Sequence, residues 1–365
     1  MVSLTNPFEE LFADRRRVAV AVVGVLALAA VPYSTTAFVT DIIFTGLVFV
    51  MLGVSWNLVA GYAGQISLGH HAFFGLGAFV SAWLTTPTRA GLPESIQSPA
   101  LLAILVGALV AGLLALVLGP LLFRLTGHYF AIGTLAVAAI IQLVLLDQRQ
   151  FSGGSSGYLV ETSLEPETVY LLMLLATVAA ILLTYAIVNS RSGLGMRAVH
   201  DDEDAASSLG VNPLRYKLMS FAVASGMAGL AGGFFAQFSG YINADSTLGV
   251  TYMVDTLVVV VLGGMGTMAG PLLGAGLFLT LDTVLRQTAG EFATTIEGAL
   301  IIVFVIFVPG GLYKLLSEHS VADVRRAVTD LRNDVSEFRR EVREDGLREA
   351  VSRRFGDDRN HGSGE

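Results

Sequence analysis

The sequence contains no cysteine and only two lysines among its 365 residues. Without cysteine the chain has no disulfide, thiolate metal site, cysteine nucleophile or iron–sulfur cluster. The two lysines, Lys217 and Lys314, each follow a tyrosine, whereas a nucleotide-binding P-loop requires the sequence Gly-Lys-Ser or Gly-Lys-Thr. The chain therefore has no P-loop for ATP, and we expect it to carry neither a metal nor a cofactor of its own.

Charge is scarce as well. Charged residues make up 14% of the chain, hydrophobic residues make up 53%, and the mean hydropathy is +0.67. Residues 317–365 alone hold 10 of the 22 Lys and Arg and 12 of the 30 Asp and Glu. The net charge of -8 argues against a nucleic-acid partner. Unbroken apolar runs of about 20 residues, unlike the alternating strands of a membrane barrel, predict an all-α integral membrane protein in contact with lipid.

The apolar runs predict a polytopic bundle of about ten transmembrane helices. They cover residues 18–39, 42–60, 66–86, 100–123, 129–147, 169–188, 218–238, 252–265, 270–286 and 294–316. The eighth and ninth are short, and the glycine-rich residues 263–271 between them leave open a broken or re-entrant pair. Three arginines, residues 15–17, precede the first run, so the positive-inside bias predicts that both termini are cytoplasmic. A signal peptide cleaved after residues 27–29 is the alternative for this first run.

These runs divide the chain into three regions. We expect a cytoplasmic N-terminal segment at residues 1–17, a transmembrane domain at 18–316 that includes a cytoplasmic loop at 189–217, and a charged cytoplasmic tail at 317–365. Apolar residues in the tail step by three and four, namely Val321, Val324, Val328, Leu331, Val335, Phe338 and Val342. The tail is predicted to be an amphipathic helix that lies against another subunit or the membrane, or alternatively forms a coiled coil.

Small residues recur at every fourth position in several predicted spans. One such stripe is formed by Gly107, Ala111, Ala115 and Gly119, and another by Ser225, Gly229 and Gly233. Small side chains let the backbones of neighbouring membrane helices approach closely. The stripes predict a tightly packed bundle, with pore lining as the less favoured role.

Polar residues and glycines gather at the start of the third span and in and after the fifth. They are Gln65, Ser67, Gly69 and His70, then Thr134, then Gly153 and Gly154 in the following loop. Glycines among polar side chains predict irregular backbone, which is tolerated at membrane depth only where protein or a water-filled cavity covers it. We expect these residues to lie along a solute pathway. For His70, a hydrogen bond to neighbouring backbone is the favoured structural role.

A short helix is predicted within the loop at 189–217. Asp202 and Glu203 stand at its start and Gly210 follows its end, because acidic side chains favour a helix N-terminus and glycine favours the position after the last turn. Its apolar residues are Ala205, Ala206 and Leu209. The sequence thus predicts a cytoplasmic helix over residues 202–209 with a small apolar face. A connecting helix lying on the membrane surface is the alternative.

Taken in this order, the segments resemble the permeases of branched-chain amino-acid ABC importers, specifically the M-type partner of the two permease subunits. The resemblance covers about residues 41–312 and is carried by the sequences at 64–70, 129–136, 153–157, 197–206 and 262–271. Three positions depart from the family pattern: His71 replaces a small residue, His128 a common proline, and Gly310 a usual arginine. These departures weaken only the inference of the substrate.

The resemblance implies a non-enzymatic ABC-importer permease in a prokaryotic cell membrane. Its implied partners are a second permease subunit, two cytoplasmic ABC ATPase subunits that bind the ATP, and an extracytoplasmic solute-binding protein. It assigns the helix at 202–209, with Gly210 at its end, to docking on an ATPase. The implied substrate is a branched-chain or other apolar amino acid, with urea, a short amide or another small solute as the alternative. A secondary transporter acting alone is the competing class.

Overall fold

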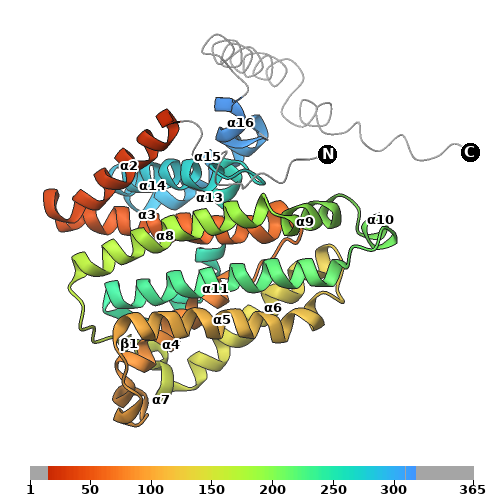
Figure 1. Cartoon of the computed structure of the whole chain (residues 1–365). Coiled ribbons are helices and arrows are strands. Elements are labelled where there is room, and N and C mark those ends of the chain that lie inside the picture. Colours follow the sequence, from red (N-terminus) through yellow and green to blue (C-terminus); the bar gives the residue numbers. More distant parts are fainter. Residues whose placement is uncertain (1–14, 309, 318–365) are drawn as a thin grey trace, which may run out of the picture.

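The computed structural model describes residues 15–308 and 310–317, and its architecture is almost entirely helical (Figure 1). The longer helices are α2 (Arg15–Ser34), α3 (Ala37–Asn57), α4 (His70–Thr85), α5 (Ala100–Leu122), α6 (His128–Asp147), α8 (Pro166–Val188), α9 (Arg191–Asp201), α11 (Pro213–Ser239), α13 (Val250–Gly263), α14 (Gly270–Ala289) and α15 (Ala293–Phe307). The shorter ones are α7 (Arg149–Ser152), α10 (Glu203–Ser208), α12 (Ala244–Thr247) and α16 (Gly311–Ser317). Strands β1 (Tyr158–Leu159) and β2 (Tyr241–Ile242) form one short antiparallel pair.

The all-α fold of an integral membrane protein is confirmed. Nine of the ten predicted runs correspond mainly to one helix each, and the tenth, residues 294–316, covers both α15 and α16. Six described stretches are long and apolar enough to cross a membrane, namely Ala37–Tyr62, Ala100–Leu122, His128–Asp147, Pro166–Val188, Pro213–Ser239 and Ala244–Gly263. The count of about ten spans stays a prediction. Most of the N-terminal segment and nearly all of the charged tail, including the apolar seam from Val321 to Val342, lie outside the described residues.

The boundary between the first two predicted spans lies earlier than expected, because α2 ends at Ser34 and α3 begins at Ala37. The hydroxyls of Ser34 and Thr35 both donate to backbone carbonyls four residues earlier, each at 2.8 Å. Pro32, inside α2, has no N–H to offer the carbonyl of Leu28. The hydroxyl of Tyr170 on α8 donates to that carbonyl instead, at 2.9 Å, and so ties α2 to the bundle.

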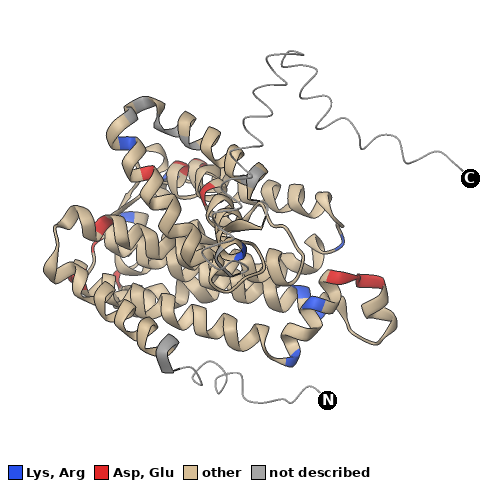
Figure 2. Ribbon diagram, turned by 90° about the horizontal axis from the view of Figure 1, so that it is seen from above, with Lys and Arg blue, Asp and Glu red and all other residues tan. Residues whose placement is uncertain are grey.

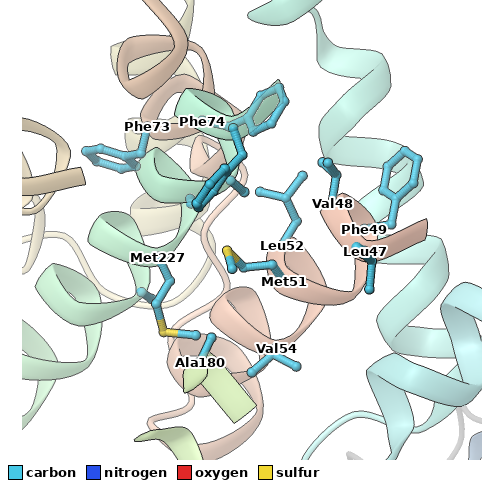
Figure 3. Packing of buried hydrophobic residues seen from close by; sticks show 14 of the residues in the cluster. Leu47, Val48, Phe49, Met51, Leu52, Val54, Phe73, Phe74, Ala180 and Met227 are labelled. Carbon is cyan, nitrogen blue, oxygen red and sulfur yellow. The ribbon is translucent and has the colours of Figure 1, made fainter. Parts of the chain in front are cut away.

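The main apolar core lies where α3, α4, α8 and α11 meet (Figure 3). On α3 most side chains are buried, as expected for a helix that is apolar on every side. Figure 3 shows Phe73 and Phe74 of α4 and Met227 of α11 beside the α3 residues Met51 and Leu52. Helix α3 is thus a central element of the bundle.

The stripes of small residues are packing faces, as predicted. A Cβ atom added at Gly77 of α4 would overlap the carbonyl oxygen of Gly229 on α11, and one added at Gly232 would overlap the carbonyl oxygen of Phe74. A Cβ at Gly107 of α5 would lie 2.7 Å from the carbonyl oxygen of Gly77. Helices α4, α5 and α11 therefore touch backbone to backbone and leave no room for larger side chains.

The eighth and ninth predicted spans are two unbroken helices, α13 and α14, joined by the turn at residues 264–269. Asn57 at the end of α3 binds this turn through both the nitrogen and the oxygen of its side-chain amide. Its Nδ2 donates to the carbonyl of Thr267 at 2.8 Å, and its Oδ1 accepts from the N–H of Gly266 at 2.7 Å. The irregular backbone of the bundle lies instead at residues 63–69, between a π-helical turn (Leu58–Tyr62) and α4.

The two ends of the bundle carry different structures (Figure 1). Helices α9 and α10 lie at one end, called here the α10 end. Helix α7 and strand β1 lie at the opposite end, called here the β1 end. Turned by 90°, the ribbon shows few charged residues, some at its edges and others near the middle of the view (Figure 2).

Candidate functional site

The predicted loop helix is present as α10, and the predicted residues define both of its ends. Asp202 is the N-cap, and its Oδ1 accepts from the N–H of Ala205 at 2.9 Å. At the other end Gly210 has φ +83°, a conformation that suits glycine. The N–H of Gly210 donates to the carbonyl of Ser207 at 2.9 Å and that of Val211 to Ala206 at 3.0 Å, the paired bonds of a Schellman motif.

The apolar face predicted for this helix is only partly correct. Leu209 is 85% exposed and Ala205 is exposed as well, so both are available to a partner. Ala206, in contrast, is 3% exposed and faces its own chain. In a helix this short, neighbouring residues point in directions about 100° apart. Ala205 and Leu209 therefore share an exposed face, whereas Ala206 packs against its own chain.

Helix α9, directly before α10, was not anticipated from the sequence. Ser190 caps it by accepting from the N–H of Ser192 at 3.1 Å. Its buried residues Gly193, Met196 and Val199 recur every third position, a helical spacing that could have revealed it. Two glycines allow close seating: a Cβ at Gly195 would clash with the ring of Tyr216 on α11, and one at Gly64 would lie 2.8 Å from the ring of His200.

Five of the seven predicted pathway residues lie together where residues 63–69 meet α6. The N–H of Leu68 donates to the hydroxyl of Thr134 at 3.0 Å, and a Cβ at Gly69 would overlap the carbonyl oxygen of Thr134. The indole of Trp56 donates to the carbonyl of Ser67 at 2.8 Å. Gln65 belongs to the same segment and is partly exposed, with Nε2 3.3 Å from the carbonyl of Ala63.

His70 pairs with a side chain and not with neighbouring backbone, which corrects the structural role favoured from the sequence. Its Nε2 is 2.8 Å from the hydroxyl oxygen of Ser55 on α3, and the hydroxyl of Ser55 also reaches the carbonyl of Leu52 at 2.8 Å. The Nδ1 atom of His70 and the hydroxyl of Ser67 are buried and have no partner in the structure. This region is therefore polar and densely packed, and it lies beside α3, α4 and α6.

Gly153 and Gly154 do not join these five residues. They follow α6, whose 20 residues place about 30 Å between its ends, whereas Thr134 lies in its second turn. Both glycines have positive φ, +75° and +58°, and they shape a loop at the β1 end. The predicted set thus falls into two groups, one at each end of α6.

At the β1 end, segments that are far apart in the sequence are hydrogen-bonded to one another. The indole of Trp83 donates to the carbonyl of Phe151 at 2.6 Å, and the side-chain amide of Asn243 donates to that of Ser155 at 2.9 Å. The N–H of Glu161 donates to the hydroxyl of Thr86 at 2.8 Å. Strands β1 and β2 add a fourth link, so this end forms one continuous cap of the bundle.

A bundle of apolar helices with packed small-residue faces, a folded cap at one end and an exposed short helix at the other defines a polytopic membrane protein. The chain belongs to the family described as the permease component of branched-chain amino acid transport systems, whose family model matches residues 38–309. The family is a transport subunit and not itself an enzyme, and its members are components of larger systems.

Relatives support this assignment. The chain is 28% identical over 326 residues to the high-affinity branched-chain amino acid transport system permease protein LivM of Escherichia coli K12, covering 80% of this chain and 74% of LivM. It is 26% identical over 287 residues to LivH of the same organism, covering 73% of this chain and 91% of LivH. A shorter match, 32% over 112 residues, links 30% of this chain to 32% of the autoinducer 2 import permease LsrC of Salmonella paratyphi B. No solved structure gives a significant match.

Proposed function

We propose that the chain is the permease subunit of an ABC importer that carries a branched-chain or other apolar amino acid into the cell. The observation that carries this proposal is α10, a capped helix at one end of the bundle with Leu209 85% exposed. An ABC permease without a P-loop of its own needs ATPase partners, and an exposed helix of this kind offers them a docking surface. The relatives LivM and LivH, named as branched-chain amino acid permeases, support the substrate class.

The proposed importer places the α10 end in the cytoplasm. Four basic residues lie at this end, in or next to α9 and α10: Arg191, Arg197, Arg215 and Lys217. Membrane proteins carry an excess of basic residues on their cytoplasmic side, so this placement agrees with the proposal. Two ATPase subunits bind there, a second permease completes the pathway, and a solute-binding protein delivers solute to the β1 end. In this proposal the chain has about ten spans, and both termini lie in the cytoplasm of a prokaryotic cell.

The two groups of predicted pathway residues then have different positions along the route. Gly153 and Gly154 lie in the β1-end cap, where solute enters. Gln65, Ser67, Gly69, His70 and Thr134 lie nearer the cytoplasmic end. Ser67, His70 and Thr134 are at most 3% exposed, which supports a closed pathway in this conformation. Opening it requires residues 63–69 to separate from α6.

Reconstitution tests the proposal. The permease is purified with the ATPases, second permease and binding protein encoded beside its gene, and uptake of radiolabelled leucine into proteoliposomes is measured with and without ATP. We expect uptake that depends on both ATP and the binding protein. Uptake of urea or acetamide in place of leucine would favour the alternative substrate class. Uptake by the chain alone, driven by an ion gradient, would overturn the proposal in favour of a secondary transporter.

A further inference from the structure

Lys217 is a buried cation at the start of a membrane-spanning helix. It lies in the second turn of α11 and is 4% exposed. Its Nζ is 2.5 Å from Oε2 of Glu203, the first residue of α10, whose side chain is 46% exposed. A buried charge is tolerated only when it is paired, and removing the partner leaves it desolvated and unsatisfied. The ion pair therefore fixes where α10 can sit relative to α11.

Besides this pair, α10 packs against α9, which precedes it in the chain. The helix has six residues, and Ala206 is its one buried residue. An alanine side chain packs without directing a rotation, whereas an ion pair at one helix end sets both distance and orientation. The connection from α10 to α11 also runs through Gly210, where the two Schellman bonds close the end of α10. The pair Glu203–Lys217 bypasses this glycine with a direct link.

Helix α11 is well placed to pass on a movement of α10. It contacts α3, α4, α5, α8, α9 and the π-helical turn at Leu58–Tyr62. Its small residues press directly on backbone, as at Gly232 against Phe74 of α4 and Gly233 against Ile104 of α5. Tightly packed interfaces transmit a displacement, because they contain few voids that could absorb it. A shift of α11 along its axis must therefore shift α4, which begins at His70 beside the packed pathway residues.

We propose that Glu203 and Lys217 are positioning residues that hold α10 rigidly on α11, so that movement imposed on α10 by the ATPase reaches the solute pathway. The proposal rests on the proposed function, because it requires an ATPase to dock on α10. Loss of the pair leaves α10 able to bind the ATPase but less firmly held on α11. ATP is then hydrolysed with less transport.

The test measures ATP hydrolysed per leucine taken up by the complete importer in proteoliposomes. Lys217→Met removes the charge and keeps most of the apolar stem, and Glu203→Gln removes the opposite charge. We expect each to raise the ratio about tenfold, which is within the usual range of coupling free energies. The exchange variant Glu203→Lys with Lys217→Glu restores an ion pair and should bring the ratio most of the way back. Arg215→Met, which removes an exposed cation from the same end of α11, should leave it unchanged.

The outcomes separate the two proposals. If wild-type permease recovers no ATPase, the proposed function fails and the ion pair is not at issue. If wild type is coupled, and the single variants assemble and keep the wild-type ratio, the positioning role is wrong. A variant that fails to assemble reports on stability only, and the exchange variant then decides. Recovery of assembly without recovery of coupling would show that the pair stabilises the fold and does not transmit movement.

Discussion

The two ends of this permease are held together in different ways. At the β1 end, hydrogen bonds join residues far apart in the chain, such as Trp83 with Phe151 and Asn243 with Ser155. At the α10 end, helix α10 is fastened to the helix that follows it, through the pair Glu203–Lys217 only 14 residues apart. One end is cross-linked between several helices, whereas helix α10 at the other end packs against its neighbours in the chain, α9 and α11.

This contrast separates a part that keeps its shape from a part that can move as a unit. A cap whose bonds join several helices resists relative movement of those helices, because each movement breaks a bond. A short helix held by α9 and, through an ion pair, by α11 can carry α11 with it when pushed. The architecture thus fits an importer in which force enters at the α10 end and the β1 end presents a constant surface to solute.

The comparison depends on the two ends facing opposite sides of the membrane, and the absence of cysteine makes this easy to test. Single cysteines replace Asp204 in α10 and Glu161 in the β1-end cap, both exposed. A membrane-impermeant maleimide on intact cells should label Glu161→Cys fully and Asp204→Cys only after permeabilisation. The cysteine-free parent gives the background. Equal labelling of both variants in intact cells would mean that the two ends do not lie across the membrane from each other.

The next largest effect is expected at the exposed face of α10. Leu209→Asp places a charge where an apolar contact with the ATPase is proposed, and should cost about 2 kcal/mol or more of docking free energy. Leucine uptake should fall to background while the amount of permease in the membrane stays normal. Ser207→Asp adds the same charge to the same short helix away from the face shared by Ala205 and Leu209, and serves as the control.

Ala206→Arg tests the buried face of the same helix. The sequence alone suggests that this change blocks docking, but Ala206 is buried in its own chain. Overpacking costs about 1–3 kcal/mol, so the change should detach α10 from the permease and increase its proteolysis. Normal ATPase copurification with Leu209→Asp, or unaltered proteolysis of Ala206→Arg, would contradict this assignment of the two faces.

The sequence was informative wherever the cause of structure is local. The start and end of α10 follow from Asp202 and Gly210, because caps act within three or four residues. The longer helices follow from apolar runs. The direction in which Ala206 points could not be predicted, since two alanines in a six-residue helix fit either face, and the choice depends on what lies beneath.

The candidate site was predictable only in part for the same reason. The structure brings residues 65–70 close to Thr134 because their spans pack side by side, and their role in a pathway stays a prediction. Gly153 and Gly154 were grouped with them by sequence order, although the length of α6 separates the two groups. The pair Glu203–Lys217 was missed, because it depends on how the chain turns between α10 and α11. Helix α9 was missed because Gly193 and Gly195 have low helix propensity, which tertiary packing overrides.

A smaller effect is expected from Gly69→Ala near the α10 end. The added Cβ would overlap the carbonyl oxygen of Thr134, so residues 63–69 must move away from α6. Overpacking of this kind costs about 1–3 kcal/mol. The melting temperature of the purified permease in detergent should fall by several degrees, and leucine uptake should fall with it. In the matched control Gly24→Ala, the new methyl group meets no heavy atom within 4 Å, so both values should stay as in wild type.

The smallest effect is expected at the β1 end, and it tests whether buried hydrogen bonds or surface charge hold the cap together. Arg89 lies 3.3 Å from Glu161, but the two side chains are 44% and 74% exposed, so water and salt screen the pair. Arg89→Gln should therefore change the free energy of unfolding by about 0–1 kcal/mol. Tyr158 is 3% exposed and its hydroxyl donates to the carbonyl of Thr86, so Tyr158→Phe leaves a buried acceptor unsatisfied and should cost about 1–3 kcal/mol. Thermal unfolding of the purified variants ranks the two changes. A larger destabilisation by Arg89→Gln would show that the cap depends on its surface charges.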